Sequence, residues 1–118
     1  MQVVYAKQPY PTSLHASIFL MGPTPRRETG GASWRPAMLQ ALEQAGFTGT
    51  VFVPEDAEGS YAHSYVDQVA WEQEGLEMAD VILAWVPREL TTMPAFTTNV
   101  EFGEFLRGGR LIYGRPAG

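Results

Sequence analysis

The stretch "SIFLMG", residues 17–22, is a continuous apolar run that closes on a glycine. Continuous runs, unlike alternating ones, are typical of strands that are covered on both faces, as in a parallel sheet. Similar runs recur along the chain as "QVVYA" (2–6), "TVFVPE" (50–55), "DVILAWVP" (80–87) and "RLIYGRP" (110–116). We therefore predict five strands that form a mostly parallel sheet.

Segments with helical periodicity lie between these runs, at 33–47, 64–79 and 98–109. In the first segment Ser33 is a candidate cap, Pro36 stands in the first turn and Gly46 marks the end. Its apolar stripe consists of Met38, Leu39, Leu42 and Ala45. The stripe of the second segment consists of Val66, Val69, Leu76 and Ala79. Gly75 interrupts this second helix at a cost of about 1 kcal/mol relative to alanine, which indicates close packing on the sheet.

Strands that alternate with helices predict a single α/β domain over residues 1–118, with an open, doubly wound, flavodoxin-like or Rossmann-like sheet between two helical layers. Ligands of such sheets bind at the carboxyl ends of the strands. The loops at this edge span 22–33, 54–63 and 86–99. All three exceed the usual length of a few residues, so we expect the functional site there.

The composition excludes several classes of function. The chain has 118 residues, a formal charge of −5 and no cysteine, so it lacks thiolate catalysis and is a poor candidate for binding nucleic acid. No apolar run reaches membrane-spanning length and no signal-peptide pattern opens the chain. We expect a cytoplasmic protein without membrane contact. Seven of the eight basic residues are arginines, which we attribute to codon usage rather than to function.

Glu101, in "TTNVEFGEF" (97–105), has two competing uses. It stands three residues after Thr98, so it matches a capping box in which the glutamate bonds back to the helix start. A carboxylate in a first helical turn is also kept ionised by the helix dipole. At the ligand edge of the sheet, such a carboxylate can attack the anomeric carbon of a sugar. The spacing does not separate these two uses.

Two further pieces of sequence carry candidate groups. Glu72 lies three residues from Val69 and four from Leu76, at the margin of the buried stripe. Partial burial there would raise its pKa and suit it to donating a proton. In "GPTPRRETGG" (22–31), Gly22 and Thr24 would allow close approach of a ligand, and Arg26 or Arg27 would meet an anionic or hydroxylated group. A flexible loop with solvated arginines is the alternative interpretation.

The segments "IFLMGPTPR", "EQEGLEMADVILAWV" and "TTNVEFGEF" together resemble the nucleoside 2-deoxyribosyltransferases and the related nucleotide N-glycosidases. The resemblance covers most of the chain and is strongest to a short bacterial nucleoside 2-deoxyribosyltransferase-like branch. Two features depart from the family pattern. Glu72 stands where the family more usually has Asp, and the segment before Glu101 reads "PAFTTN" where the family has an Asp and a Gly-Thr or Gly-Ser pair.

The resemblance implies roles for individual residues. Glu101 would attack C1′ of the deoxyribose and expel the base, and Glu72 would handle the proton of that base. Gly22, Pro23 and Thr24 would line the sugar and base site, and Asn99 would bond to the sugar. The aromatic residues that would either stack on the base or belong to the core are Trp71, Trp34 and Phe96.

The ligand implied by this resemblance is a small nucleoside or nucleotide, with no metal or organic cofactor. An acidic domain whose last strand is not followed by a covering helix also predicts a homodimer. Two other function classes stay open at this point. One is a module on the same fold that binds a nucleotide-like ligand without cleaving it, and the other is a flavodoxin-like flavin binder, which would be yellow.

Overall fold

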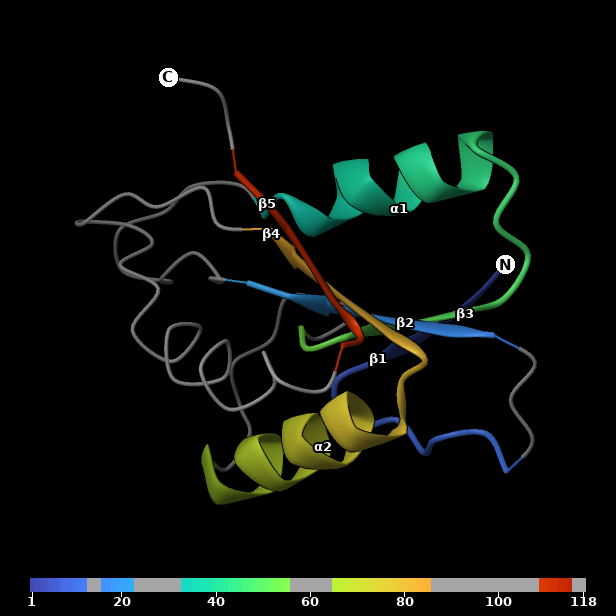
Figure 1. The fold of residues 1–118 in the computed structure, drawn as a ribbon. Helices are drawn as coiled ribbons and strands as arrows, with labels where there is room; N and C mark the ends of the chain where they lie inside the picture. Colours follow the sequence, from blue (N-terminus) through green and yellow to red (C-terminus); the bar gives the residue numbers. More distant parts are fainter. Residues whose placement is uncertain (13–15, 23–32, 56–64, 86–108, 116–118) are drawn as a thin grey trace.

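Five parallel strands form one sheet in the computed structural model, which describes residues 1–12, 16–22, 33–55, 65–85 and 109–115. The strands are β1 (Gln2–Tyr5), β2 (Ser17–Met21), β3 (Thr50–Val53), β4 (Val81–Trp85) and β5 (Leu111–Gly114), in the spatial order β1-β3-β2-β4-β5. Helix α1 (Arg35–Gln44) covers one face of the sheet and α2 (Tyr65–Met78) covers the other (Figure 1). This arrangement confirms the predicted open, doubly wound α/β fold.

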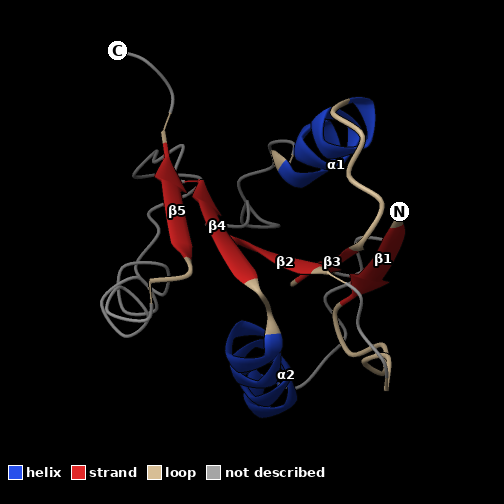
Figure 2. Ribbon diagram, turned by 45° about the vertical axis from the view of Figure 1, so that its right-hand side comes forward, coloured by secondary structure: helices blue, strands red, loops and turns tan. Residues whose placement is uncertain are grey.

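The strand order explains why the two helices lie on opposite faces. From β2 the chain passes through α1 to β3 on one side of β2, and it then returns through α2 to β4 on the other side (Figure 2). Crossovers of the same hand that move in opposite directions leave their helices on opposite faces of a sheet. The switch in direction falls at β2 and β4, and ligands of doubly wound sheets bind at such a point, outside the carboxyl ends of the strands.

The continuous apolar runs arise because both faces of the central strands are covered. Successive side chains of a strand point to opposite faces, so Phe19 and Met21 of β2 join the core beneath α2, while Leu20 joins the core beneath α1. All residues of β3 are buried. The edge strand β5 differs, because Ile112 and Tyr113 are 58% and 49% exposed.

Helix α1 follows the sequence prediction except at its two ends. The helix begins at Arg35 and its N-cap is Trp34, which makes no side-chain capping bond, so the prediction of Ser33 as the cap was wrong. The Ser33 hydroxyl instead accepts a hydrogen bond from the Arg35 backbone N–H.

Pro36 stands in the first turn, and Gly46 has a φ of 89° just beyond the last turn, a conformation that suits glycine. Met38, Leu39 and Leu42 pack on the sheet as predicted. Ala45 is exposed, and its assignment to the buried stripe was wrong because the helix has already ended at Gln44.

Helix α2 buries a different stripe from the predicted one. Leu76 and Ala79 are buried as expected, but Val69 is 40% exposed, which corrects its assignment to the apolar face. The indole of Trp71 packs against the sheet instead, so α2 is rotated about its own axis relative to the predicted orientation. Residues one helical turn apart share a face, so Glu72 lies on the sheet side with Gly75 and Leu76. The side chain of Val66 and the predicted helix at 98–109 lie outside the described residues.

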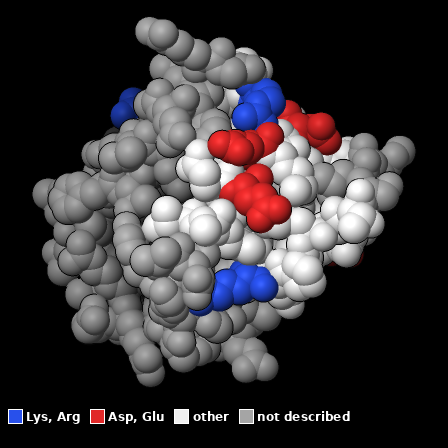
Figure 3. Space-filling view, turned by 90° about the horizontal axis from the view of Figure 1, so that it is seen from below, with Lys and Arg blue, Asp and Glu red and all other residues white. Residues whose placement is uncertain are grey.

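Polar contacts fix the amino end of the sheet. The Asp80 carboxylate accepts a hydrogen bond from the Ser17 backbone N–H at 2.9 Å, and the Asp80 N–H donates to the Ser17 hydroxyl at 2.9 Å. The Arg110 guanidinium donates to the Leu76 and Ala79 carbonyls, which otherwise have no donor at the end of a helix. On the side of the molecule that α2 covers, several acidic side chains lie next to one another (Figure 3).

We predict that Gly75→Ala destabilises the protein. Helix propensity alone favours alanine by about 1 kcal/mol. A Cβ at this position would overlap the Tyr10 hydroxyl and lie 2.8 Å from the Phe19 ring, and overpacking of this kind costs about 1–3 kcal/mol. Urea unfolding should therefore give a lower free energy of unfolding. The reference variant is Ala70→Gly, at an exposed position of the same helix; stabilisation by Gly75→Ala would contradict the packing argument.

Candidate functional site

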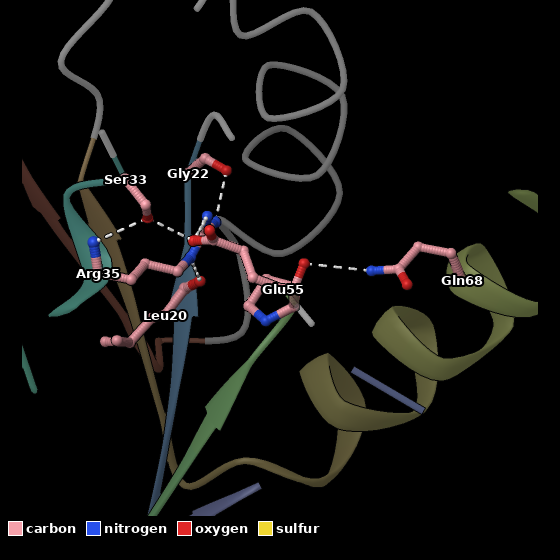
Figure 4. A network of polar contacts seen from close by, with 7 residues as sticks. Leu20, Gly22, Ser33, Arg35, Glu55 and Gln68 are labelled. Carbon is pink, nitrogen blue, oxygen red and sulfur yellow. Dashed lines mark hydrogen bonds and ion pairs between the residues drawn. The ribbon is translucent and has the colours of Figure 1, made fainter. Parts of the chain in front are cut away.

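The carboxyl edge of the sheet opens between β2 and β3. Their pairing ends at Phe19 and Phe52, whereas β2 continues beside β4 as far as Met21. The Arg35 guanidinium fills this opening (Figure 4). Its Nε donates to the Leu20 carbonyl at 3.1 Å, and Nη2 donates to the Gly22 carbonyl at 2.6 Å. The guanidinium thus replaces the donors that β3 no longer supplies to β2.

An ion pair completes the surroundings of Arg35. Nη1 lies 2.7 Å from Oε2 of Glu55, the second residue after β3. The same Oε2 accepts a hydrogen bond from the Ser33 hydroxyl at 2.6 Å, and that hydroxyl accepts one from the Arg35 backbone N–H at 3.1 Å. Arg35 is only 1% exposed. A charge buried to this extent needs a partner and hydrogen bonds of good geometry, and both are present.

Neither Arg35 nor Glu55 was among the predicted site residues. Two of the arginines have structural roles: Arg35 ties together the ends of two strands, and Arg110 caps α2. The attribution of the arginine content to codon usage stays a prediction. One signal was available in "SWRP" (33–36). A cation in the first turn of a helix is unfavourable in the field of the helix dipole, so an arginine there needs a specific partner.

Gly22 allows β2, β4 and the start of α1 to approach one another closely. A Cβ on Gly22 would overlap the Trp85 carbonyl oxygen and lie 2.6 Å from the Trp34 ring. The sequence predicts that a ligand approaches Gly22 closely. Among the described residues, the groups that come this close to Gly22 are the Trp85 carbonyl and the Trp34 ring. Pro23, Thr24 and Arg26, which share its loop, lie outside the described residues, as do Phe96, Asn99 and Glu101.

Glu72 places a carboxyl group beneath the carboxyl ends of the strands, on the α2 side. Its side chain is hydrogen-bonded to that of Gln68, and the Gln68 amide donates to the Pro54 carbonyl, just after β3, at 3.2 Å. Burial raises the pKa of Glu72 from 4.5 to about 7, although the Arg35 charge and the Gln68 hydrogen bond both lower it. The predicted rise in pKa is confirmed. A carboxyl group poised near neutral pH can both give and take a proton.

Trp71 belongs to the core. It is 8% exposed, and its indole N–H donates to the Gln8 carbonyl at 3.0 Å. The Tyr10 ring stacks on it with centroids 4.9 Å apart. Of its two predicted roles, base stacking and core packing, the structure supports core packing. Trp34 contacts Arg35, whose guanidinium carbon lies 4.7 Å from the centre of its ring.

The described residues hold no group of three histidine or carboxylate side chains that could bind a metal ion. In the same part of the chain, no helix is both long and apolar enough to cross a membrane.

Most of the chain matches a known protein family. The family model described as "Nucleoside 2-deoxyribosyltransferase like" matches residues 15–117. The match includes α1, α2 and the strands from β2 to β5. It therefore covers Arg35, Glu55 and Glu72. No curated protein matches the chain.

We predict that Arg35→Met lowers the free energy of unfolding by about 3–5 kcal/mol, because removal of one partner of a buried pair leaves the other charge uncompensated. The Leu20 and Gly22 carbonyls would also lose their donor. Urea unfolding measures the loss. Arg115→Met, at an exposed arginine after β5, is the matched control and should change stability little. Equal effects of the two variants would contradict the role of Arg35.

We also predict that Glu72 makes the protein less stable as pH rises from about 4.5 to about 7. In this window the folded state holds a proton that the unfolded chain has lost, so stability falls by at most about 1.4 kcal/mol per pH unit. Glu72→Gln should remove this contribution. The control is Glu74→Gln, at an exposed carboxylate of the same helix. Identical pH profiles of unfolding for wild type and Glu72→Gln would refute the prediction.

Proposed function

Because the chain belongs to the nucleoside 2-deoxyribosyltransferase-like family, we propose that it cleaves the N-glycosidic bond of a nucleoside or nucleotide and passes the sugar to a second base or to water. The proposed reaction is retaining and proceeds through a covalent glycosyl-glutamate. Glu101 is the proposed nucleophile and Glu72 the proposed acid and base. The observation that carries the proposal is the half-buried Glu72 carboxyl, with a pKa near neutrality, at the ligand edge of a doubly wound sheet.

In the first proposed step, a carboxylate oxygen of Glu101 forms a bond to C1′ while the bond from C1′ to the base nitrogen breaks. The departing base takes a proton from the Glu72 carboxyl group, which becomes a carboxylate. Protonation avoids the release of a base anion, and general acid catalysis of this kind contributes about 10²–10⁴-fold in rate. The sugar is now an ester of Glu101.

In the second step, a nitrogen of an acceptor base or the oxygen of water attacks C1′. The attacking atom gives its proton to the Glu72 carboxylate, and the ester bond breaks to return Glu101 as a carboxylate. Each step inverts C1′, so the product keeps the configuration of the substrate. Glu72 serves both steps only if its pKa lies near the working pH, which agrees with a value of about 7.

The support for Glu101 comes from the sequence, because Glu101 lies outside the described residues. The motif "VEFG" (100–103) falls where the resembled family has its catalytic glutamate. The supporting contacts of Glu72 come from the structure. Gln68 holds the side chain, and Arg35 lies close enough to act on its charge. Thr24 and Asn99 are the proposed contacts of the sugar.

We predict that a 2-fluoro-2-deoxy nucleoside traps the proposed intermediate. Fluorine next to C1′ destabilises the positively charged transition state, so the ester should form and then persist. Intact-mass spectrometry should show one adduct, and peptide mapping should place it on Glu101. Glu101→Gln should give none. Glu104→Gln, three residues further on, is the matched control and should still react. A folded wild-type protein that gives no adduct at Glu101 would eliminate the nucleophile.

The role of Glu72 is tested separately by the release of free base from a panel of 2′-deoxynucleosides and their 5′-monophosphates. Glu72→Gln should lower the rate by about 10²–10⁴-fold, and Glu74→Gln should leave it close to wild type. Chromatography measures the base. If wild-type protein binds these compounds but releases no base after long incubation, the function is that of a binding module. The altered segment "PAFTTN" before Glu101 is the feature that favours this second function.

A further inference from the structure

A tyrosine from the N-terminal segment bonds to the turn of α2 that carries Glu72. The Tyr10 hydroxyl donates to the Trp71 carbonyl at 2.6 Å. The hydroxyl also lies against Gly75, one helical turn further on, where a Cβ would overlap it. It therefore contacts this turn at Trp71 and at Gly75, on either side of Glu72.

Aromatic packing fixes the position of this hydroxyl. The Tyr10 ring stacks on Trp71 with an interplanar angle of 17° and meets the edge of Phe52 with centroids 4.9 Å apart. The Trp71 indole bonds back to the Gln8 carbonyl, two residues before Tyr10. Gly75 leaves the room that the hydroxyl needs, because a Cβ there would overlap it. Tyr10 thus reaches the helix in one defined orientation.

The N-terminal segment lies outside the part of the chain that matches the family. The match begins at residue 15, whereas β1 and Tyr10 precede it. Strand β1 pairs with β3 along its whole length, from Gln2 to Tyr5. This pairing anchors the segment on the sheet, and Tyr10 carries the connection across to α2.

We propose that Tyr10 is a positioning residue for Glu72. By its bond to the Trp71 carbonyl and its contact with Gly75, the hydroxyl holds the turn at the depth where the Glu72 carboxyl is half buried. The catalytic meaning of this role rests on the proposed function; the structural coupling does not.

Several charged or titratable groups among the described residues act on this corner of the molecule. Arg35 approaches Glu72 from α1, and its charge is shared with Glu55 after β3. Tyr10 faces α2, and burial raises its pKa, with Glu74 and Glu72 adding to the rise. Tyr10 is therefore neutral whenever Glu72 titrates, and it acts on Glu72 through geometry rather than charge.

The test is Tyr10→Phe, which keeps the ring and removes the hydroxyl that bonds to the Trp71 carbonyl. Without the hydroxyl the turn should relax and Glu72 should become more hydrated. Titration of the ¹³C-labelled Glu72 carboxyl by NMR should show its pKa fall from about 7 toward 4.5. Tyr5→Phe, a hydroxyl deletion on β1 that faces the α1 side of the sheet, should leave the Glu72 pKa unchanged. A pKa in Tyr10→Phe that stays the same or rises would overturn the proposal.

Enzyme kinetics give a second readout that a merely structural role would not move. Glu72 must be protonated to release the base, so activity should fall at high pH. In Tyr10→Phe the high-pH fall in kcat should move to lower pH. The size of this move should equal the drop in the Glu72 pKa that NMR measures. A uniform loss of activity at every pH would count against positioning. The NMR titration needs no substrate, so it stands even if trapping at Glu101 fails and the proposed function is wrong.

Discussion

Beyond Phe19 and Phe52 the two central strands stop pairing, and the buried guanidinium of Arg35 joins their ends instead. A parallel sheet that opens at its carboxyl edge exposes carbonyls that need donors. From the start of α1, Arg35 supplies N–H donors to two of these carbonyls. Glu55 balances the charge of Arg35. The loops after β2 and β3 therefore leave the sheet from fixed points, and α1 is held by the same contacts. The carboxyl edge of the sheet between β2 and β3 is held by this one side chain.

The same ion pair shapes the chemistry on the other side of the sheet. Arg35 is already bound to Glu55 at 2.7 Å, so only part of its field acts on Glu72. Burial then has the larger effect and raises the pKa of Glu72 to about 7. Two carboxylates at one sheet edge thus have different environments. Glu55 is the partner of a fixed cation. The Glu72 carboxyl is bonded to the neutral Gln68 side chain, and burial raises its pKa to about 7.

The N-terminal segment adds a constraint that the family match does not include. Tyr10 lies between β3 and α2, where it contacts Phe52 and Trp71 and bonds to the turn that contains Glu72. Strand β1 pairs with β3 and thereby anchors the segment that carries Tyr10 to α2. Gly75 lowers the helix propensity of α2, but it leaves the space that the Tyr10 hydroxyl occupies.

The sequence by itself determined the fold class, the five strands and the two described helices, because burial on both faces leaves continuous apolar runs and helices keep their period. It also predicted the raised pKa of Glu72, from its place at the margin of an apolar stripe. Only the tertiary structure decided which face of α2 is buried. Helical periodicity allows either Val69 or Trp71 to face the sheet, and in the structure Trp71 is buried and Val69 is exposed. The tertiary structure also decided the partners of Arg35 and Tyr10. Arg35 lies 20 residues from Glu55 and Tyr10 lies 61 from Trp71, and no local pattern specifies contacts over such separations.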